Sequence, residues 1–164
     1  HGPHTRQART RVNLALAEEL CRRFEGFRAR PYLCPAGVAT IGYGSTHYAD
    51  GRRVQLTDPL ITEPAARALL AAELLSTYAP GVLRQCPGLL PLALLDADWR
   101  RLNAIVDFTY NLGVGRLQTS TLRRRINAGD WDGAAAELGK WVWGGGRKLP
   151  GLVTRRAVEA ALLR

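Results

Sequence analysis

Cysteine is scarce in this sequence, and long apolar runs are absent. Three cysteines are too few and too oddly numbered for a disulfide scaffold, so at least one thiol stays unpaired. We expect Cys21 and Cys86 to be buried thiols, with a disulfide between them as the alternative. Because no CxxC pair or His-Cys cluster occurs, we expect neither a metal nor a cofactor. The longest uncharged run, residues 31–49, contains proline and glycine and cannot form an apolar helix that spans a bilayer.

Acidic residues are also few relative to basic ones. Fourteen aspartates and glutamates face 21 arginines and two lysines, which gives a net charge of +9. Such a charge predicts attraction to a polyanion, either a nucleic acid, an anionic membrane surface or an anionic cell-wall polymer. No helix-turn-helix, zinc finger or aromatic RNA-binding motif is evident, so we do not expect nucleic acid to be the partner.

The remaining composition is that of a folded domain. Of the 164 residues, 46% are hydrophobic and 23% are charged, as in globular proteins of one domain or two small lobes. We place the domain at residues 5–164 and set aside residues 1–4, HGPH, as a candidate expression remnant. No signal peptide or transmembrane anchor is visible in the sequence, and we expect a monomer.

The first third of the sequence predicts one helix followed by a small sheet. An amphipathic helix is expected over residues 9–24, with Gly26 as its stop. Its apolar residues recur every four positions, at Val12, Leu16, Leu20 and Phe24. Residues 31–56 predict two or three short antiparallel strands, because Tyr, Val, Thr and Ile alternate there with turn signals such as Asp50-Gly51.

Helical patterns resume after the predicted sheet. The expected helices cover residues 62–78, 98–112, 120–127, 131–142 and the segment after the loop GGGRKLPG. Prolines at positions 80, 87 and 91 are expected to break the chain before the second of these helices. The fold class is therefore α+β. Its N-terminal lobe covers about residues 9–60, its connecting helix about 62–80 and its helical lobe about 81–164.

The stretch RFEGFRARPYLCPAGVATIGYGST, residues 23–46, holds a single carboxylate at the predicted helix end. Glycosidic hydrolysis by two-carboxylate enzymes needs an acid that protonates the leaving oxygen and a second group that activates water or stabilises charge. Glu25 is the candidate acid, although a glutamate at a helix end is also typical of a solvated or salt-bridged surface residue. Asp50 is the rival second carboxylate, but its place in a turn explains it without catalysis.

This stretch resembles the active-site segment of phage-type lysozymes, the endolysins of glycoside hydrolase family 24. In that family a Glu-Gly pair ends the first helix, an Asp follows nine residues after the Glu, and a Thr lies fifteen after it in a T-x-G-x-G strand. Glu25 with Gly26 and Thr40 in TIGYGST match, whereas Cys34 stands in place of the Asp. The resemblance continues over residues 108–131 and 144–159. It implies a mostly helical lysozyme-like fold with a cleft between the two lobes.

The thiol at position 34 leaves three roles open. Cys34 acts as a thiolate base for water, as a nucleophile toward the sugar, or as a group that positions water together with Thr40. A thiol with an ordinary pKa of about 8.5 is mostly protonated at pH 7, so a base needs cations such as Arg28 or Arg30 nearby. We favour water activation because family members of this kind are associated with inversion, which places water between the two groups. A small buried hydrophobe is the alternative for Cys34, and an ordinary strand residue for Thr40.

The C-terminal matches add candidate substrate-binding residues. The segment TYNLG resembles the family segment that faces the cleft, so Tyr110 and Asn111 are candidate sugar contacts, or else form a helix end capped by Asn111 or Gly113. Arg155 and Arg156 match paired arginines near the family's last helix, and one of them is expected to lie toward the catalytic acid. This lobe also contains Trp131, Trp141 and Trp143, and we expect most of these three side chains to lie in the core.

The resemblance implies a muramidase that cleaves the β-1,4 bond between N-acetylmuramic acid and N-acetylglucosamine for bacterial lysis, with Glu25, Cys34 and Thr40 as catalytic residues. Its expected partners are peptidoglycan and an anionic outer-membrane surface. The protein would accumulate in the host cytoplasm and reach the periplasm and wall after a holin permeabilises the membrane.

Two other functions remain open. Cys34 with His47 as its base could form a cysteine amidase or endopeptidase that cuts the peptides of the wall. The second alternative is a non-catalytic basic antibacterial protein that binds the wall or the membrane. Cell killing by a Glu25→Gln variant would favour the non-catalytic function.

Overall fold

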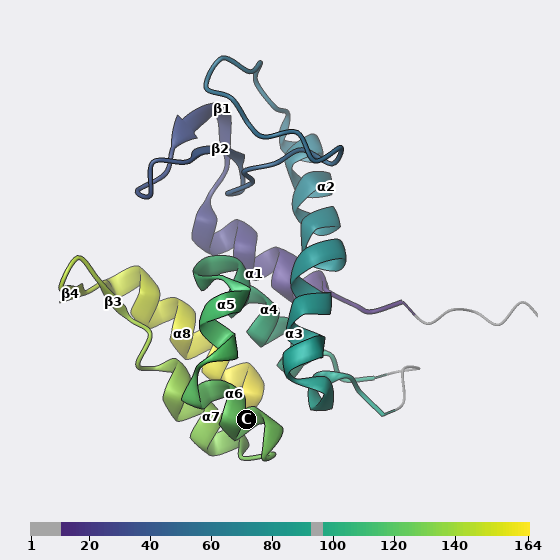
Figure 1. Ribbon diagram of the computed structural model, residues 1–164, viewed down its shortest axis with the longest axis vertical. Helices are drawn as coiled ribbons and strands as arrows, with labels where there is room; N and C mark the ends of the chain where they lie inside the picture. Colours follow the sequence, from purple (N-terminus) through teal and green to yellow (C-terminus); the bar gives the residue numbers. More distant parts are fainter. Residues whose placement is uncertain (1–10, 93–96) are drawn as a thin grey trace, which may run out of the picture.

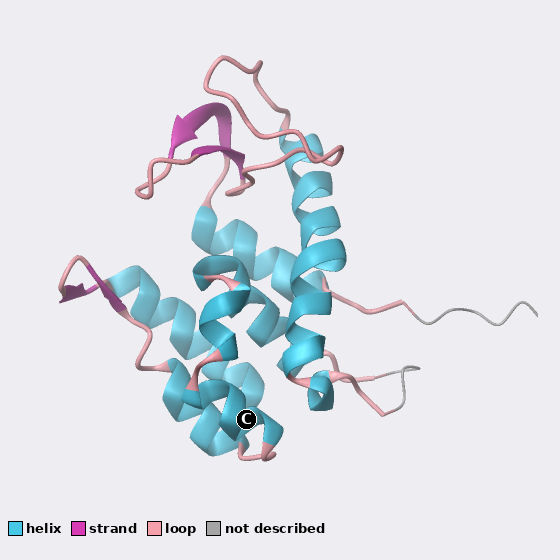
Figure 2. Ribbon diagram, viewed as in Figure 1, coloured by secondary structure: helices cyan, strands magenta, loops and turns pink. Residues whose placement is uncertain are grey.

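The computed structural model describes residues 11–92 and 97–164 (Figure 1). A small sheet lies at one end of the molecule, most helices gather at the other end, and one long helix runs along the side between them. Among the described residues, Figure 2 shows strands in this sheet and in one hairpin near the last helix. This is the mostly helical α+β arrangement that the sequence predicts. Residues 1–4 and the expected helix start at residue 9 lie outside the described residues.

Helix α1 (Ala15–Glu25) begins later than the periodicity predicts. The side chain of Asn13 accepts a hydrogen bond from the Ala15 N–H at 3.0 Å, a local bond that competes with continuing the helix backward. The predicted apolar stripe is wrong at Leu16, which is 41% exposed. The face that packs into the core is instead made by Ala17, Leu20 and Cys21.

Strands β1 (Arg28–Leu33) and β2 (Ala39–Gly42) form the predicted antiparallel sheet. Thr40 pairs with Tyr32 across the two strands, and the register is irregular between Arg28 and Tyr32. Residues 34–38 make the connecting turn. The sheet therefore places the end of β1 beside the start of β2, at the end of the N-terminal lobe that is far from most helices (Figure 1).

The connecting helix is longer than predicted. Helix α2 (Glu63–Glu73) continues through a π-helical turn, η1 (Leu74–Tyr78), into α3 (Ala79–Gln85). The expected break at Pro80 is therefore wrong. Pro80 lies in the first turn of α3, directly after the π turn. At this position the helix is not broken by the lack of a proline N–H, because the wider π turn changes the hydrogen-bond pattern there.

The helical lobe contains the predicted helices together with shorter elements that the sequence did not predict. After a short 3₁₀ turn, η2 (Pro87–Leu89), come α4 (Arg100–Leu112), α5 (Val114–Gln118), α6 (Thr121–Asn127), α7 (Trp131–Leu138), β3 (Trp143–Gly144), β4 (Arg147–Lys148) and α8 (Pro150–Leu163). Helix α5 was not expected, and neither was the β3–β4 hairpin. The helix predicted over residues 131–142 ends at Leu138, and the glycines that follow form the hairpin turn instead.

Helix α4 lies at the centre of the core, and every residue from 102 to 109 is buried. Trp141 packs edge to face on Phe108 with ring centroids 5.5 Å apart, and Trp131 lies under the guanidinium of Arg101 at 4.0 Å. Trp143 is 58% exposed, so two of the three tryptophans pack with the core, as expected. Within the described part of the chain, none of the helices has the length and apolar character needed to cross a bilayer.

Candidate active site

Glu25 is the last residue of α1, at the point where the N-terminal lobe meets the helical lobe. Gly26 follows with a φ of 74°, a conformation that glycine adopts readily, and ends the helix as predicted. The Glu25 side chain is 26% exposed, so an external ligand can reach it. Gly44 approaches it from the segment after β2: a Cβ there would lie 3.6 Å from Glu25 Oε2 and 3.3 Å from Tyr110 Oη.

A buried arginine holds the Glu25 carboxylate. Arg155, on α8, donates from Nη1 to Glu25 Oε1 at 2.6 Å. Its Nε and Nη2 atoms donate to both carboxylate oxygens of Asp107 at 2.9 and 2.8 Å. Cys21, one turn before Glu25, donates from its thiol to Asp107 Oδ1 at 3.2 Å. Three helices that are distant in sequence, α1, α4 and α8, thus meet in one ion-pair network beneath Glu25.

Burial and charge act in opposite directions on this network. Burial raises the pKa of Asp107 most, but the hydrogen bonds from Arg155, Glu159 and Cys21 together with the charge of Arg155 outweigh it and hold that pKa below its ordinary value. Burial alone lowers the pKa of Arg155, whereas Asp107 raises it above the ordinary value. Burial raises the pKa of the Cys21 thiol, which keeps it neutral and able to donate. The arginine and Asp107 are therefore both charged and fix one another.

Cys34 lies in an open turn just after β1 and is partly exposed. Its N–H donates to the carbonyl of Val38 at 3.0 Å, and the N–H of Gly37 donates to the Cys34 carbonyl at 2.8 Å. The Val38 N–H lowers the pKa of the Cys34 thiol most, and the Ala36 N–H lowers it further, partly opposed by burial. The small buried hydrophobe considered for Cys34 is therefore wrong, because the turn exposes the sulfur to backbone donors.

Thr40 lies on the same face of the sheet as Cys34. The sheet register pairs Thr40 with Tyr32. Cys34 follows Tyr32 by two residues, and side chains two residues apart in an extended segment point to the same face. The Thr40 hydroxyl is buried, 3% exposed as a residue, and donates to the Val38 carbonyl at 2.9 Å. Tyr32 links this face to the acid: burial raises its pKa most, Arg28 lowers it, and the charges of Glu25 and Cys34 both raise it. Tyr32, the strand partner of Thr40, is thus within electrostatic reach of both Glu25 and Cys34.

Tyr110 and Asn111 end helix α4 close to the same junction. The Tyr110 hydroxyl donates to the Tyr43 carbonyl at 2.7 Å, so its polar atom already has a protein partner. Asn111 Oδ1 is buried, and no partner for it occurs within the described residues. The helix end itself is capped by Gly113, which has a φ of 92°.

The two arginines of the TRR segment have different positions. Only Arg155 lies toward Glu25, as expected for one of the pair. Arg156 donates to Glu159 at 2.8 Å and packs over Phe108, with 5.2 Å between its Cζ atom and the ring centroid. Arg155 is 3% exposed and Arg156 is 1% exposed, so neither presents a surface to a sugar chain. The structure thus does not support direct substrate contact by either arginine.

Two further candidates from the sequence, Asp50 and His47, lie apart from the network beneath Glu25. Asp50 accepts a hydrogen bond from the Arg52 N–H at 2.9 Å inside its turn, the backbone role expected for it. The His47 ring pairs with the Thr46 hydroxyl at 2.9 Å, and no hydrogen bond joins it to Cys34 in the described ranges. Cys21 and Cys86 are buried thiols, as expected. No cluster of three or more His, Cys, Asp or Glu suited to a metal occurs within residues 11–92 and 97–164.

Sequence reasoning missed two acids near the site, the buried Asp107 and the partly buried Glu73. Each is an isolated carboxylate in an apolar helical segment, in AIVDFTY and LLAAELL respectively. Because carboxylates are rarely buried without a partner, such an acid on a predicted core face is a signal of a polar network or a ligand site. The sequence of the predicted helices therefore indicated a buried acid at each position, but it did not indicate which residue would pair with that acid.

The chain is similar to known proteins along most of its length. Residues 22–159 match the family model described as phage lysozyme. The chain is 38% identical over 135 residues to the SAR-endolysin of Bacteriophage PS119, which covers 82% of this chain and 73% of that relative. It is 37% identical over 147 residues to the endolysin of Acyrthosiphon pisum secondary endosymbiont phage 1, over 87% of this chain and 91% of that one. The solved muramidase domain of SpmX from Asticaccaulis excentricus has a TM-score of 0.73 and 28% identity, over 93% of this chain and 98% of that domain.

Proposed function

Because the chain belongs to the phage lysozyme family and is a peptidoglycan-cleaving lysozyme, we propose that it is a muramidase. The bond cleaved is the β-1,4 bond between N-acetylmuramic acid and N-acetylglucosamine. One observation carries the proposal: Glu25 is partly exposed and held by Arg155 where the lobes meet. Tyr32, the strand partner of Thr40, lies within electrostatic reach of both Glu25 and Cys34. The similarity to a muramidase domain supports the same bond.

Glu25 is the proposed general acid. It donates a proton to the glycosidic oxygen while the bond between that oxygen and the anomeric carbon breaks. Arg155 acts on the reaction only through Glu25, because Asp107 occupies two of its donors and the guanidinium is buried. This fixes the direction from which the carboxyl meets the glycosidic oxygen. Asn111 is the proposed sugar contact at the end of α4.

Cys34 and Thr40 are proposed to handle the attacking water. The water oxygen bonds to the anomeric carbon from the face opposite the leaving oxygen, and the Cys34 thiolate takes the proton that the water releases. The backbone donors that lower the pKa of Cys34 support the thiolate form. The Thr40 hydroxyl donates to Val38, so its oxygen is left to accept a hydrogen bond from the water. The product then has an inverted anomeric centre.

The test is cleavage of purified peptidoglycan by wild type, Glu25→Gln, Cys34→Ala and Cys34→Asp. We measure turbidity loss, new reducing ends, and the reducing sugar after borohydride reduction. The expected result is reduced muramic acid from wild type and Cys34→Asp, a loss of about 10²- to 10⁴-fold in Glu25→Gln, and a large loss in Cys34→Ala. NMR of the first-formed product anomer tests inversion. Glu19→Gln, an exposed glutamate on the same helix, is the control.

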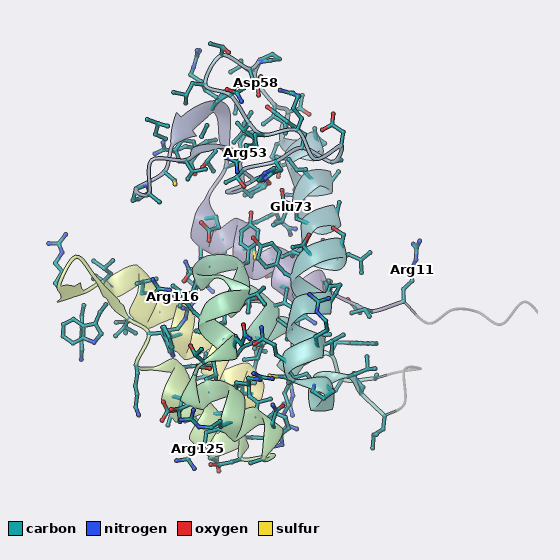
Figure 3. All side chains as sticks on the ribbon, in the orientation of Figure 1. Arg11, Arg53, Asp58, Glu73, Arg116 and Arg125 are labelled. Carbon is teal, nitrogen blue, oxygen red and sulfur yellow. The ribbon has the colours of Figure 1, made fainter. Side chains whose placement is uncertain are left out.

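Three results would contradict parts of this proposal. Reduced glucosamine in place of muramic acid would assign cleavage to the other glycosidic bond. Full activity of Cys34→Ala would make the thiol a bystander. Lysis by Glu25→Gln without any reducing ends would favour a non-catalytic basic protein that binds the wall or the outer membrane. Exposed arginines of the helical lobe, such as Arg116 and Arg125 in Figure 3, would then make the binding contacts.

The cellular part of the proposal is release by a holin from the host cytoplasm to the wall. The observation behind it is the similarity to phage endolysins. Expression of the chain alone should leave cells intact, and lysis should follow when a holin or chloroform permeabilises the membrane. Lysis by the chain without either treatment would show that it reaches the wall unaided.

A further inference from the structure

Glu73 is a partly buried carboxylate that no basic residue of the described chain neutralises. Figure 3 shows it on the flank of α2 that faces the strands. Its Oε1 atom is buried without a hydrogen-bonding partner among the described residues, and so is Oγ of Ser45, which is 1% exposed. Ser45 is near enough to Glu73 to stabilise its charged form. The Ser45 hydroxyl is the one polar group of the described residues that lowers the pKa of Glu73, and a neutral hydroxyl supplies no counter-charge, so the partly buried carboxylate points to a cationic ligand.

This lack of a cation is unusual in an arginine-rich chain. Within residues 11–92 and 97–164, every carboxylate other than Glu73, Glu19 and Asp50 has a basic partner within 4.0 Å. Glu19 and Asp50 are exposed to solvent and need none. Among the described residues, Glu73 is therefore the partly buried carboxylate that has no basic partner and can pair with a cation of a ligand.

A cavity of about 470 Å³ opens beside Glu73. One wall comes from residues 46–51 after β2, and the other comes from residues 69–78 of α2 and the π turn. Hydroxyl groups of Ser76 and Thr77 line it, and Leu69 and Ala72 add an apolar surface. An alkyl ammonium group suits this lining, because its three N–H donors need acceptor oxygens and its methylene groups need an apolar wall.

Two tyrosines connect this cavity to the candidate active site. Tyr78 lines the cavity and packs edge to face on Tyr110, with ring centroids 5.1 Å apart. Tyr110 in turn lies against Gly44, which is next to Glu25. Burial raises the pKa of Tyr78 most, and the charges of both Glu73 and Glu25 raise it further. Both carboxylates are thus within electrostatic reach of the same ring.

We propose that the Glu73 cavity binds the primary ammonium group of a diamino-acid side chain in the peptides carried by the glycan. This rests on the proposed muramidase function, because it takes peptidoglycan as the substrate. The ammonium group donates to Glu73, and the alkyl chain lies against Leu69. The cavity then selects glycan that carries free amines over glycan that does not.

The first test is binding without catalysis. Nα-acetyl-L-lysine amide is titrated into wild type, Glu73→Gln and Glu19→Gln, and amide NMR shifts of residues 44–48 are followed. We expect saturable shifts in wild type and in Glu19→Gln, and binding weaker by about tenfold or more in Glu73→Gln. The uncharged Nα,Nε-diacetyl-lysine amide should not bind. Equal binding of the two lysine derivatives, or no loss in Glu73→Gln, would overturn the proposal.

The second test compares soluble peptidoglycan strands before and after acetylation of their free amines. For wild type, acetylation should raise KM about tenfold with little change in kcat, because the ammonium contact is remote from the bond cleaved. For Glu73→Gln, the two substrates should have the same KM. An equal effect of acetylation on both proteins would overturn the proposal. If neither protein releases reducing ends, the muramidase function fails, whereas the lysine titration still decides whether the cavity binds amines.

Discussion

The two sides of the candidate active site are built in different ways. On the acid side, Glu25 is fixed by Arg155, which is itself fixed by Asp107, with the charged groups contributed by three helices. On the thiol side, Cys34 lies in a short exposed turn whose own backbone supplies the hydrogen bonds. The position of the acid depends on the whole fold, whereas that of the thiol depends on five consecutive residues. Mutations should therefore separate stability from activity on the two sides.

The largest effect is expected for Asp107→Ala. It leaves the buried Arg155 without its bidentate partner, and breaking a buried ion pair in this way costs about 3–5 kcal/mol in the free energy of unfolding. Urea unfolding measures the loss, and activity should fall with it because Glu25 loses its support. Asp132→Ala, at a side chain that is 92% exposed, is the control and should change little. An Asp107→Ala protein as stable as wild type would mean that the network does not hold the acid side together.

Glu73 sharpens the comparison, because it is a partly buried acid that has no arginine partner among the described residues. Burial raises its pKa from 4.5 to about 7, partly opposed by the Ser45 hydroxyl. The folded protein then holds this proton more tightly than the unfolded chain, so the stability it contributes is full below pH 4.5 and is lost as the pH rises to about 7.

Glu73→Gln should remove this pH dependence. Between pH 4.5 and pH 8 the wild type should lose roughly 2 kcal/mol more of its free energy of unfolding than the variant, a value that allows for the partial exposure of the side chain. Urea unfolding of wild type, Glu73→Gln and Glu19→Gln at both pH values measures the difference. The same pH dependence in all three proteins would mean that Glu73 ionises without cost.

Gly37→Ala tests the turn on the thiol side. Gly37 has a φ of 76°, and a side chain in this left-handed conformation costs about 1 kcal/mol. No atom lies within 4 Å of the added Cβ, so the effect is on the backbone that holds Cys34 and not on packing. We expect a small loss of stability together with a clear loss of activity. Gly115→Ala, in a helix with open space around it, should be neutral or stabilising.

The smallest effect on stability is expected for Cys34→Ala. Cys34 is partly exposed in its turn, so the urea midpoint should change little. Activity should nevertheless fall steeply, and Cys34→Asp should restore it. A Cys34→Ala protein that unfolds much more easily than wild type would mean that the thiol is part of the packing, and would remove the contrast between the two sides.

The sequence predicted local features better than the contacts between distant segments. The Glu25–Gly26 helix end, the strands on either side of Cys34 and the Asp50 turn are set by neighbouring residues, and they were predicted correctly. Whether Arg155 or Arg156 faces the acid depends on how α8 rotates against α4, which no local pattern contains. The same limit hid Asp107, whose partner lies 48 positions away.

The connecting helix shows a second limit of sequence patterns. A proline usually ends a helix, and this general rule placed a break at Pro80. The π turn at residues 74–78 removes the conflict by changing the backbone before the proline. Neither the hydrophobic pattern nor the proline indicates such a turn, because it is a local rearrangement within an otherwise regular helix.

The contact between Arg155 and Glu25 joins residues 130 positions apart. During synthesis on the ribosome, α1 emerges early, but the residue that orients its acid emerges only with α8. A nascent or truncated chain that lacks α8 therefore has Glu25 without the arginine that orients it. Glu25 is therefore oriented by its arginine only after nearly all of the domain has been synthesised, so the site assembles at the end of synthesis.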